Sequence, residues 1–168
     1  MSYTSPYSFL PDEHMRLVGI IAFHWEAVDL SLQRAVAEIT MTDCGGIAIL
    51  TDMIGFRSKT EIIMAYARQF QSGDPLKWKE FVSALEGVKD AYTLRNKFVH
   101  ARWIDGPDTT RPLRVDFRLS GGRLKQEEVP TEIGELYAAA TAIFNAGGAM
   151  TTCLWKCGLM LPSQETPA

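Results

Sequence analysis

Apolar residues recur at intervals of three and four along several stretches of this chain. The first stretch runs from Asp12 to about Thr40, and the apolar positions at this spacing are Val18, Ile21, Trp25, Val28, Leu32, Ala35 and Ile39. Such spacing places the side chains on one stripe of an α-helix. Asp12 is suited to cap that helix, because its carboxylate can accept hydrogen bonds from the first free N–H groups. The sequence therefore predicts one long amphipathic helix over residues 12–40.

Two more helices are expected before the middle of the chain. Residues Ile47–Ile54 form a short apolar segment that Gly55 ends, which predicts a short helix. The residues Ser58-Lys-Thr-Glu61 have the spacing of a capping box. We therefore expect the second main helix to run from Ser58 to about Gln71.

The third main helix is predicted to begin near Leu76 and to end at Gly106, where a Gly-Pro pair stops it. The last helix is expected to be capped by Thr131 and to continue the spacing of three and four to Leu154. Its stripe includes Gly147, which allows a neighbouring helix to come close.

Between these two helices the pattern changes to strict alternation. Residues Leu113–Leu119 alternate apolar and polar, Ser120-Gly-Gly122 is a turn, and Arg123–Val129 can return as a second strand. A two-stranded hairpin is not stable alone, so it must pack against the helices or against another chain. The predicted fold is therefore mainly all-α: an antiparallel bundle of four to five helices with a β-hairpin inserted before the last helix.

The 168 residues suffice for one domain, which we place at residues 12–161. Residues 1–11 are expected to form an N-terminal arm, and residues 162–168 a flexible tail. No apolar run reaches the length of a membrane span, and no signal peptide is recognisable. The three cysteines are too few and wrongly spaced for a disulfide framework. We therefore expect a cytoplasmic protein that does not act at a membrane.

Charge is distributed unevenly along the chain. The net charge is −3, but Lys89 to Lys125 holds nine Lys and Arg against four Asp, a local charge of +5. Such asymmetry can steer a polyanion to one face of a protein. A solvated face without a partner explains the same pattern equally well.

Polar residues interrupt the apolar stripe of the third main helix near its end. The stripe is apolar up to Tyr92 and then places Arg95 and Arg102 at equivalent positions, with Asn96 and His100 on a neighbouring ridge. Burying a guanidinium is costly unless it has a partner or a task. The chain contains no phosphate-binding loop, dinucleotide fingerprint or HExxH metal motif that would supply another chemistry.

The segment Arg95-Asn-Lys-Phe-Val-His100 resembles the signature of the HEPN superfamily, in which an Arg and a following polar residue precede a His late in a long helix. The predicted bundle also agrees with that family. The resemblance implies a metal-independent endoribonuclease without cofactors, which acts as a homodimer whose two motifs face one cleft. It also admits a cognate antitoxin or inhibitor protein as a partner.

The resemblance implies catalytic roles for Arg95, Asn96 and His100. His100 would transfer protons, Arg95 would hold the scissile phosphate by its planar fork, and Asn96 would orient the imidazole or the phosphate. One motif His per chain means that an acid and a base together require a dimer. The residues expected to bind the backbone of single-stranded RNA around the site are Lys97, Arg102, Arg114 and Arg118.

Other interpretations remain open at this point. Arg95 could form a buried ion pair with Glu26 or Asp29 of the first helix, and the chain could be a non-catalytic HEPN-like module for RNA binding, protein binding or dimerisation. Some family members carry a Tyr two residues after the motif His, but this chain has Arg102 there. Regulation that modifies such a tyrosine is therefore not expected.

Overall fold

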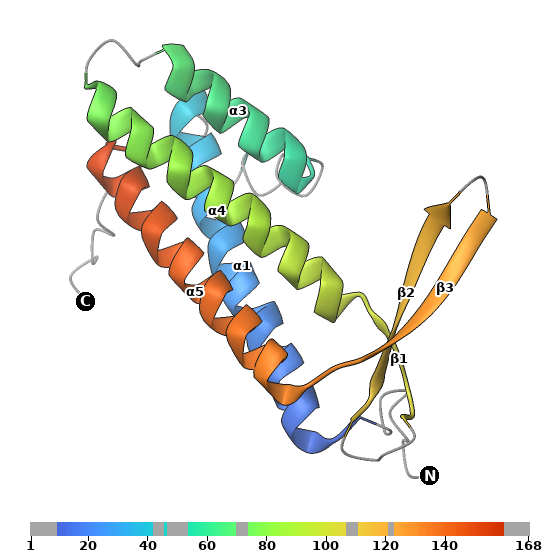
Figure 1. Cartoon of the computed structure of the whole chain (residues 1–168). Helices are drawn as coiled ribbons and strands as arrows, with labels where there is room; N and C mark the ends of the chain where they lie inside the picture. The colour runs from blue at the N-terminus through green and yellow to red at the C-terminus, as the bar shows by residue number, and fades with distance from the viewer. Residues whose placement is uncertain are drawn as a thin grey trace.

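The computed structural model describes residues 10–41, 46, 54–69, 74–106, 111–120 and 123–159. Within them the chain is mainly helical, with a small antiparallel sheet before the last helix (Figure 1). The elements are α1 (Asp12–Thr40), α3 (Phe56–Gln69), α4 (Pro75–Val99), β1 (Arg102–Ile104), β2 (Leu113–Ser120), β3 (Arg123–Pro130) and α5 (Ile133–Lys156). Residues 1–9, the predicted tail, and residues 47–53 of the predicted short helix lie outside the described residues.

Helix α1 has the bounds that its periodicity predicts. Its buried side includes Ile21, Trp25 and Leu32, three positions of the predicted apolar stripe. The predicted cap is wrong, because Asp12 is already helical and the residue before the helix is Pro11, which makes no side-chain cap. Proline can take this place because it has no N–H that needs a partner.

The helices do not all alternate in direction, so the antiparallel part of the fold prediction is wrong. His14 of α1 approaches the carbonyl of Thr131 just before α5, and Ser31 of α1 contacts Thr151 of α5. Helices α1 and α5 are therefore parallel neighbours, and α4 runs in the opposite direction and packs against both (Figure 1). The alternation fails between α1 and α3, which run in the same direction: Trp25 of α1 contacts Phe56 of α3, and Asp29, one turn later, pairs with Lys59.

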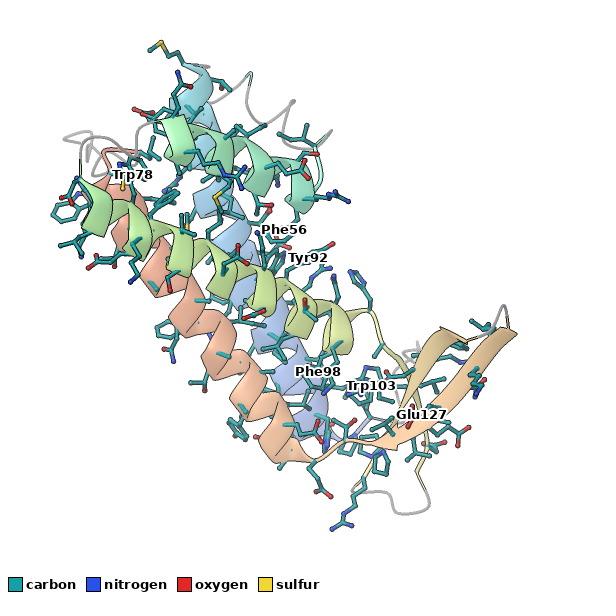
Figure 2. The ribbon with its side chains drawn as sticks, turned by 45° about the horizontal axis from the view of Figure 1, so that its top comes forward. Phe56, Trp78, Tyr92, Phe98, Trp103 and Glu127 are labelled. Carbon is teal, nitrogen blue, oxygen red and sulfur yellow. The ribbon has the colours of Figure 1, made fainter. Side chains whose placement is uncertain are left out.

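Helix α3 begins two residues earlier than the capping-box pattern predicts. Ser58 lies inside the first turn, and Phe56 opens the helix. Phe56 stacks on Tyr92 of α4 with ring centroids 4.1 Å apart, and both rings contact Trp25 (Figure 2). This aromatic contact fixes the start of α3 against α1 and α4, so packing overrides the local capping signal.

Helix α4 ends at Val99, seven residues before the predicted stop at Gly106. At its start Asp74 accepts hydrogen bonds from the N–H groups of Leu76 and Lys77. After His100 the chain extends into β1, where Trp103 pairs with Arg114 of β2. Pairing with β2 and burial of the indole override the helical spacing of this segment.

The predicted hairpin is confirmed as β2 and β3, and β1 adds a third strand in the order β1-β2-β3. The predicted cap of α5 is wrong. Thr131 is fully buried, and its hydroxyl donates to the carbonyl of Val129, whereas Glu132 occupies the capping position without a side-chain hydrogen bond.

Candidate functional site

The three motif residues meet at the C-terminal end of α4. The Arg95 Nη1 atom donates a hydrogen bond to the Asn96 side-chain oxygen at 3.0 Å, and it also contacts the Nε2 atom of His100. His100 is the residue at which the helix ends, with φ −96° and ψ 6°. Residues 95 and 100 are thus joined by their side chains across the last turn of α4.

The Arg95 guanidinium lies against the His100 ring, with its Nη1 atom next to His100 Nε2. The imidazole itself is exposed, whereas Arg95 is half-buried. The Arg95 Nε atom is buried and has no hydrogen-bond partner among the described residues. An incoming oxygen acceptor is the kind of group that would satisfy it.

The carboxylates proposed as partners for Arg95 do not take that role. Asp29 accepts both of its short hydrogen bonds from the Lys59 ammonium, at 2.8 and 2.9 Å. Glu26 is exposed on α1. Within the part of the chain that the structure describes, Arg95 is held by Asn96 and His100 and forms no ion pair. No carboxylate of the described residues therefore neutralises its positive charge.

Two of the expected RNA-binding residues are exposed near this site. Lys97 forms an exposed ion pair of 3.4 Å with Glu135 of α5, and its ammonium lies 4.9 Å from the centre of the Phe98 ring. Arg102 is exposed at the start of β1. Exposed ion pairs of this kind are weak, so Lys97 can exchange Glu135 for a phosphate at little cost.

The other two expected RNA-binding residues lie on β2. Arg114 is only 3% exposed, and its Nε and Nη2 atoms bind the two oxygens of Asp116 at 2.8 and 2.9 Å. Its guanidinium also lies 5.4 Å from the centre of the Phe98 ring. We assign Arg114 a structural role for this reason. Arg118 is described only by its backbone, which pairs with Lys125 of β3.

A groove of about 410 Å³ between α3 and α4 brings in residues that the sequence pattern did not single out. Lys89 lines it and lies two helical turns before Asn96 on the same ridge of α4. The full lining is Arg57, Thr60, Glu61, Met64, Ala65, Arg68, Glu86 and Lys89. The spacing of seven residues between Lys89 and Asn96 is the signal that could have linked the groove to the motif.

A larger groove of about 880 Å³ runs between α4 and α5. Gly87 lines it, and Gly87 and Asn96 are two and a half turns apart, so this groove lies on the opposite side of α4 from the motif. It is lined mostly by small and apolar side chains. Its charged lining residues, Lys79, Glu80 and Asp90, belong to this side of α4, away from the motif.

Trp103 lies three residues after the motif histidine. It is buried, and its indole N–H donates to the Phe98 carbonyl at 3.3 Å (Figure 2). One of the carbonyls freed at the end of α4 is thereby satisfied. Trp103 belongs to the core and supports the turn that carries His100.

Among the described residues, no three His, Cys, Asp or Glu side chains are grouped so that they could hold a metal ion. No helix within the described ranges is long and apolar enough to cross a membrane. Comparisons with protein-family models, with curated proteins and with solved structures found no match to this chain.

Proposed function

We propose that this chain is a metal-independent endoribonuclease of the HEPN type, which cleaves single-stranded RNA as a homodimer. The observation that carries the proposal is the contact of Arg95 with both Asn96 and His100. This contact places a guanidinium, which can bind a phosphate, beside an exposed imidazole at the end of one helix. The motif spacing in the sequence and the side-chain contacts agree on the same three residues.

The chemistry follows from what each group can do to an RNA phosphate. An imidazole can accept the proton of a 2′-hydroxyl, whose oxygen then attacks the adjacent phosphorus. The bond to the 5′-oxygen breaks, and that oxygen takes a proton from an acid. The products are a 2′,3′-cyclic phosphate and a free 5′-hydroxyl. Arg95 stabilises the negative charge that grows on the phosphate oxygens between these two states.

The homodimer is part of the proposal because one motif provides one imidazole. His100 in its neutral form serves as the base, and a protonated second His100 serves as the acid. A second copy of the chain supplies that group if the two motifs face a shared cleft. The exposure of His100 supports this arrangement, because a buried imidazole could not reach a partner's substrate.

The RNA path that fits the charges runs along the ridge of α4 from His100 and Asn96 to Lys89. Arg57 and Arg68 line the far wall of the same groove. The ion pairs of Arg57 with Glu61 and of Lys89 with Glu86, at 2.8 and 2.7 Å, are exposed and readily exchanged. Phosphate contacts of this kind position RNA without reading its sequence.

Cleavage of labelled single-stranded RNA in EDTA tests the proposal. We expect His100→Ala and Arg95→Ala to lower the rate by about 100-fold or more, since general acid–base catalysis contributes about 10² to 10⁴. His24→Ala is the matched control, because His24 lies on α1 against Phe144 and far from the motif in the sequence. A substrate with a 2′-deoxy sugar at the scissile position should resist cleavage.

Unchanged cleavage in both motif variants would refute the assignment. The second candidate function, a non-catalytic HEPN-like module, is favoured by one observation: Arg95 is already satisfied in part by its own chain's Asn96 and His100. RNA binding that Arg95→Ala abolishes, with no cleavage by the native protein, would support the module instead.

A further inference from the structure

The hairpin of β2 and β3 extends away from the helical body (Figure 1). Among the described residues, these strands make nearly all their contacts with each other and with β1, and no helix packs along either of them. Their base is anchored where Arg114 lies over the Phe98 ring. A two-stranded ribbon is only marginally stable in water, so its outer half lacks support within this chain.

The outer half of the hairpin also exposes apolar area and a strand edge. Leu124 is 66% exposed and Phe117 is 49% exposed, and the register places them on one face of the ribbon. In the part of the chain that the structure describes, β3 is an edge strand of the sheet, so every second residue directs its N–H and C=O away from β2. A free edge of this kind is a template for another strand.

We infer that the free edge of β3 pairs with β3 of a second copy of this chain. The two strands run antiparallel about a two-fold axis at Gln126. The two three-stranded sheets thereby become one continuous six-stranded sheet. The surface is isologous, because the same residues of both copies form it.

The charges of β3 select this register. A two-fold axis perpendicular to the sheet passes through one residue position of β3. That residue therefore lies directly opposite the same residue of the second chain. An axis at Lys125, Glu127 or Glu128 would place like charges directly opposite, which destabilises a strand pair. An axis at Leu124 would place Arg123 opposite the partner's Lys125.

An axis at Gln126 avoids every such conflict. Gln126 then faces the partner's Gln126, and Lys125 faces the partner's Glu127. The same Lys–Glu pair recurs on the other side of the axis. Opposite charges in directly facing positions stabilise a strand pair, so both pairs favour association.

The strand pairing leaves the two motifs apart. In the six-stranded sheet the order is β1-β2-β3 followed by the partner's β3, β2 and β1, so the two β1 strands are the outermost strands. Neighbouring strands lie about 4.8 Å apart, which separates the two β1 strands by about 24 Å across the sheet. The shared cleft of the proposed function would use another surface, and the strand pairing does not depend on RNA cleavage.

Charge reversal tests the pairing, with the molar mass measured over a range of concentrations by sedimentation. In Lys125→Glu, two pairs of like charges face each other across the axis, and Glu127→Lys does the same with the opposite sign. We expect each single variant to raise the dimer dissociation constant roughly tenfold or more, because two attractive pairs become repulsive. The double variant restores both pairs and should return the constant to within about threefold.

The single variants need a control for folding. In the strand register of the hairpin Lys125 pairs with Arg118, and Glu127 pairs with Asp116. Asp116 and Glu127 also have partners within this chain, so urea denaturation of each variant beside the native chain checks that the fold is retained. An equimolar mixture of Lys125→Glu and Glu127→Lys should also form a heterodimer in which both pairs across the axis are attractive.

Three outcomes would overturn the inference: a monomer at all concentrations, a dimer that neither single variant weakens, or a double variant that does not recover. Single variants that stay dimeric but lose RNA affinity would assign this edge to RNA instead. His100→Ala should remain dimeric with a normal dissociation constant. A loss of cleavage in that variant is thereby separated from a loss of pairing.

Discussion

Trp103 of β1 donates its indole N–H to the Phe98 carbonyl of α4 at 3.3 Å, and both side chains are buried. The bond joins the last turn of the long helix to the first strand of the sheet. His100 lies between the two residues in the sequence. The turn that presents the motif histidine is therefore held by a contact from the segment that follows it.

Replacing Trp103 by Phe should lower the free energy of unfolding by about 1–2 kcal/mol, since a buried carbonyl loses its donor and the ring loses volume. Urea denaturation measures the change. Trp155→Phe is the matched control, because Trp155 is 62% exposed and should change stability by less than about 0.5 kcal/mol. Equal losses in both variants would contradict the structural role of Trp103.

The two adjacent glycines of α5 should respond in opposite ways to alanine. A Cβ atom at Gly147 would lie 2.9 Å from Val28 Cγ2 of α1, whereas a Cβ at Gly148 meets nothing within 4 Å. Gly147→Ala should therefore cost about 1–3 kcal/mol through overpacking. Gly148→Ala should gain about 0.5–1 kcal/mol from helix propensity.

Thermal unfolding of these two variants, and of Gly147→Ala combined with Val28→Ala, checks the explanation. Val28→Ala removes the clashing methyl group, so the double variant should be less destabilised than the sum of the two single variants. Strict additivity would show that Gly147 is not required for the close approach of α1 and α5.

Lys59 and Asp29 form an ion pair that joins α3 to α1, with side chains 5% and 18% exposed. Lys59→Met leaves the carboxylate without its cation and should cost on the order of 3 kcal/mol. Adding Asp29→Leu should recover most of that loss. Arg57→Met is the control: its pair with Glu61 is exposed, so the cost should stay below about 1 kcal/mol.

Acid should destabilise the protein through Glu13. Hydrogen bonds from Arg16 and then Tyr137 lower the pKa of this carboxyl from 4.5 to about 2. Its contribution to stability is complete above pH 4.5 and is lost as the pH falls towards 2, because the unfolded state takes up the proton first. Denaturation curves of Glu13→Gln should depend less on pH in this window.

The Glu13 effect should shrink in high salt, because the three side chains are solvent-exposed and their charges are screened. Arg16→Gln removes the largest cause of the lowered pKa and should flatten the same part of the pH profile. A profile that neither variant changes would assign the acid sensitivity to other carboxyl groups.

Periodicity alone predicted α1 to its last residue and the two strands of the hairpin. These elements are governed by local rules: a stripe at intervals of three and four for α1, and alternation about a Gly-Gly turn for the hairpin. The spacing of four also predicted that Asn96 and His100 share one ridge. The contact of Arg95 with His100, five residues on, did not follow from helical spacing, because His100 is where the helix ends. Their role in RNA cleavage remains a proposal.

The tertiary structure decided what depends on partners distant in the sequence. Helix α4 ends at Val99 because Trp103 is buried and pairs with Arg114. Arg114, expected at an RNA surface, is instead buried against Asp116 and Phe98. Helices α1 and α5 are parallel because α3 runs in the same direction as α1, which tertiary contacts such as Asp29 with Lys59 determine. Local spacing specifies which face of an element is apolar, but only packing determines what that face meets.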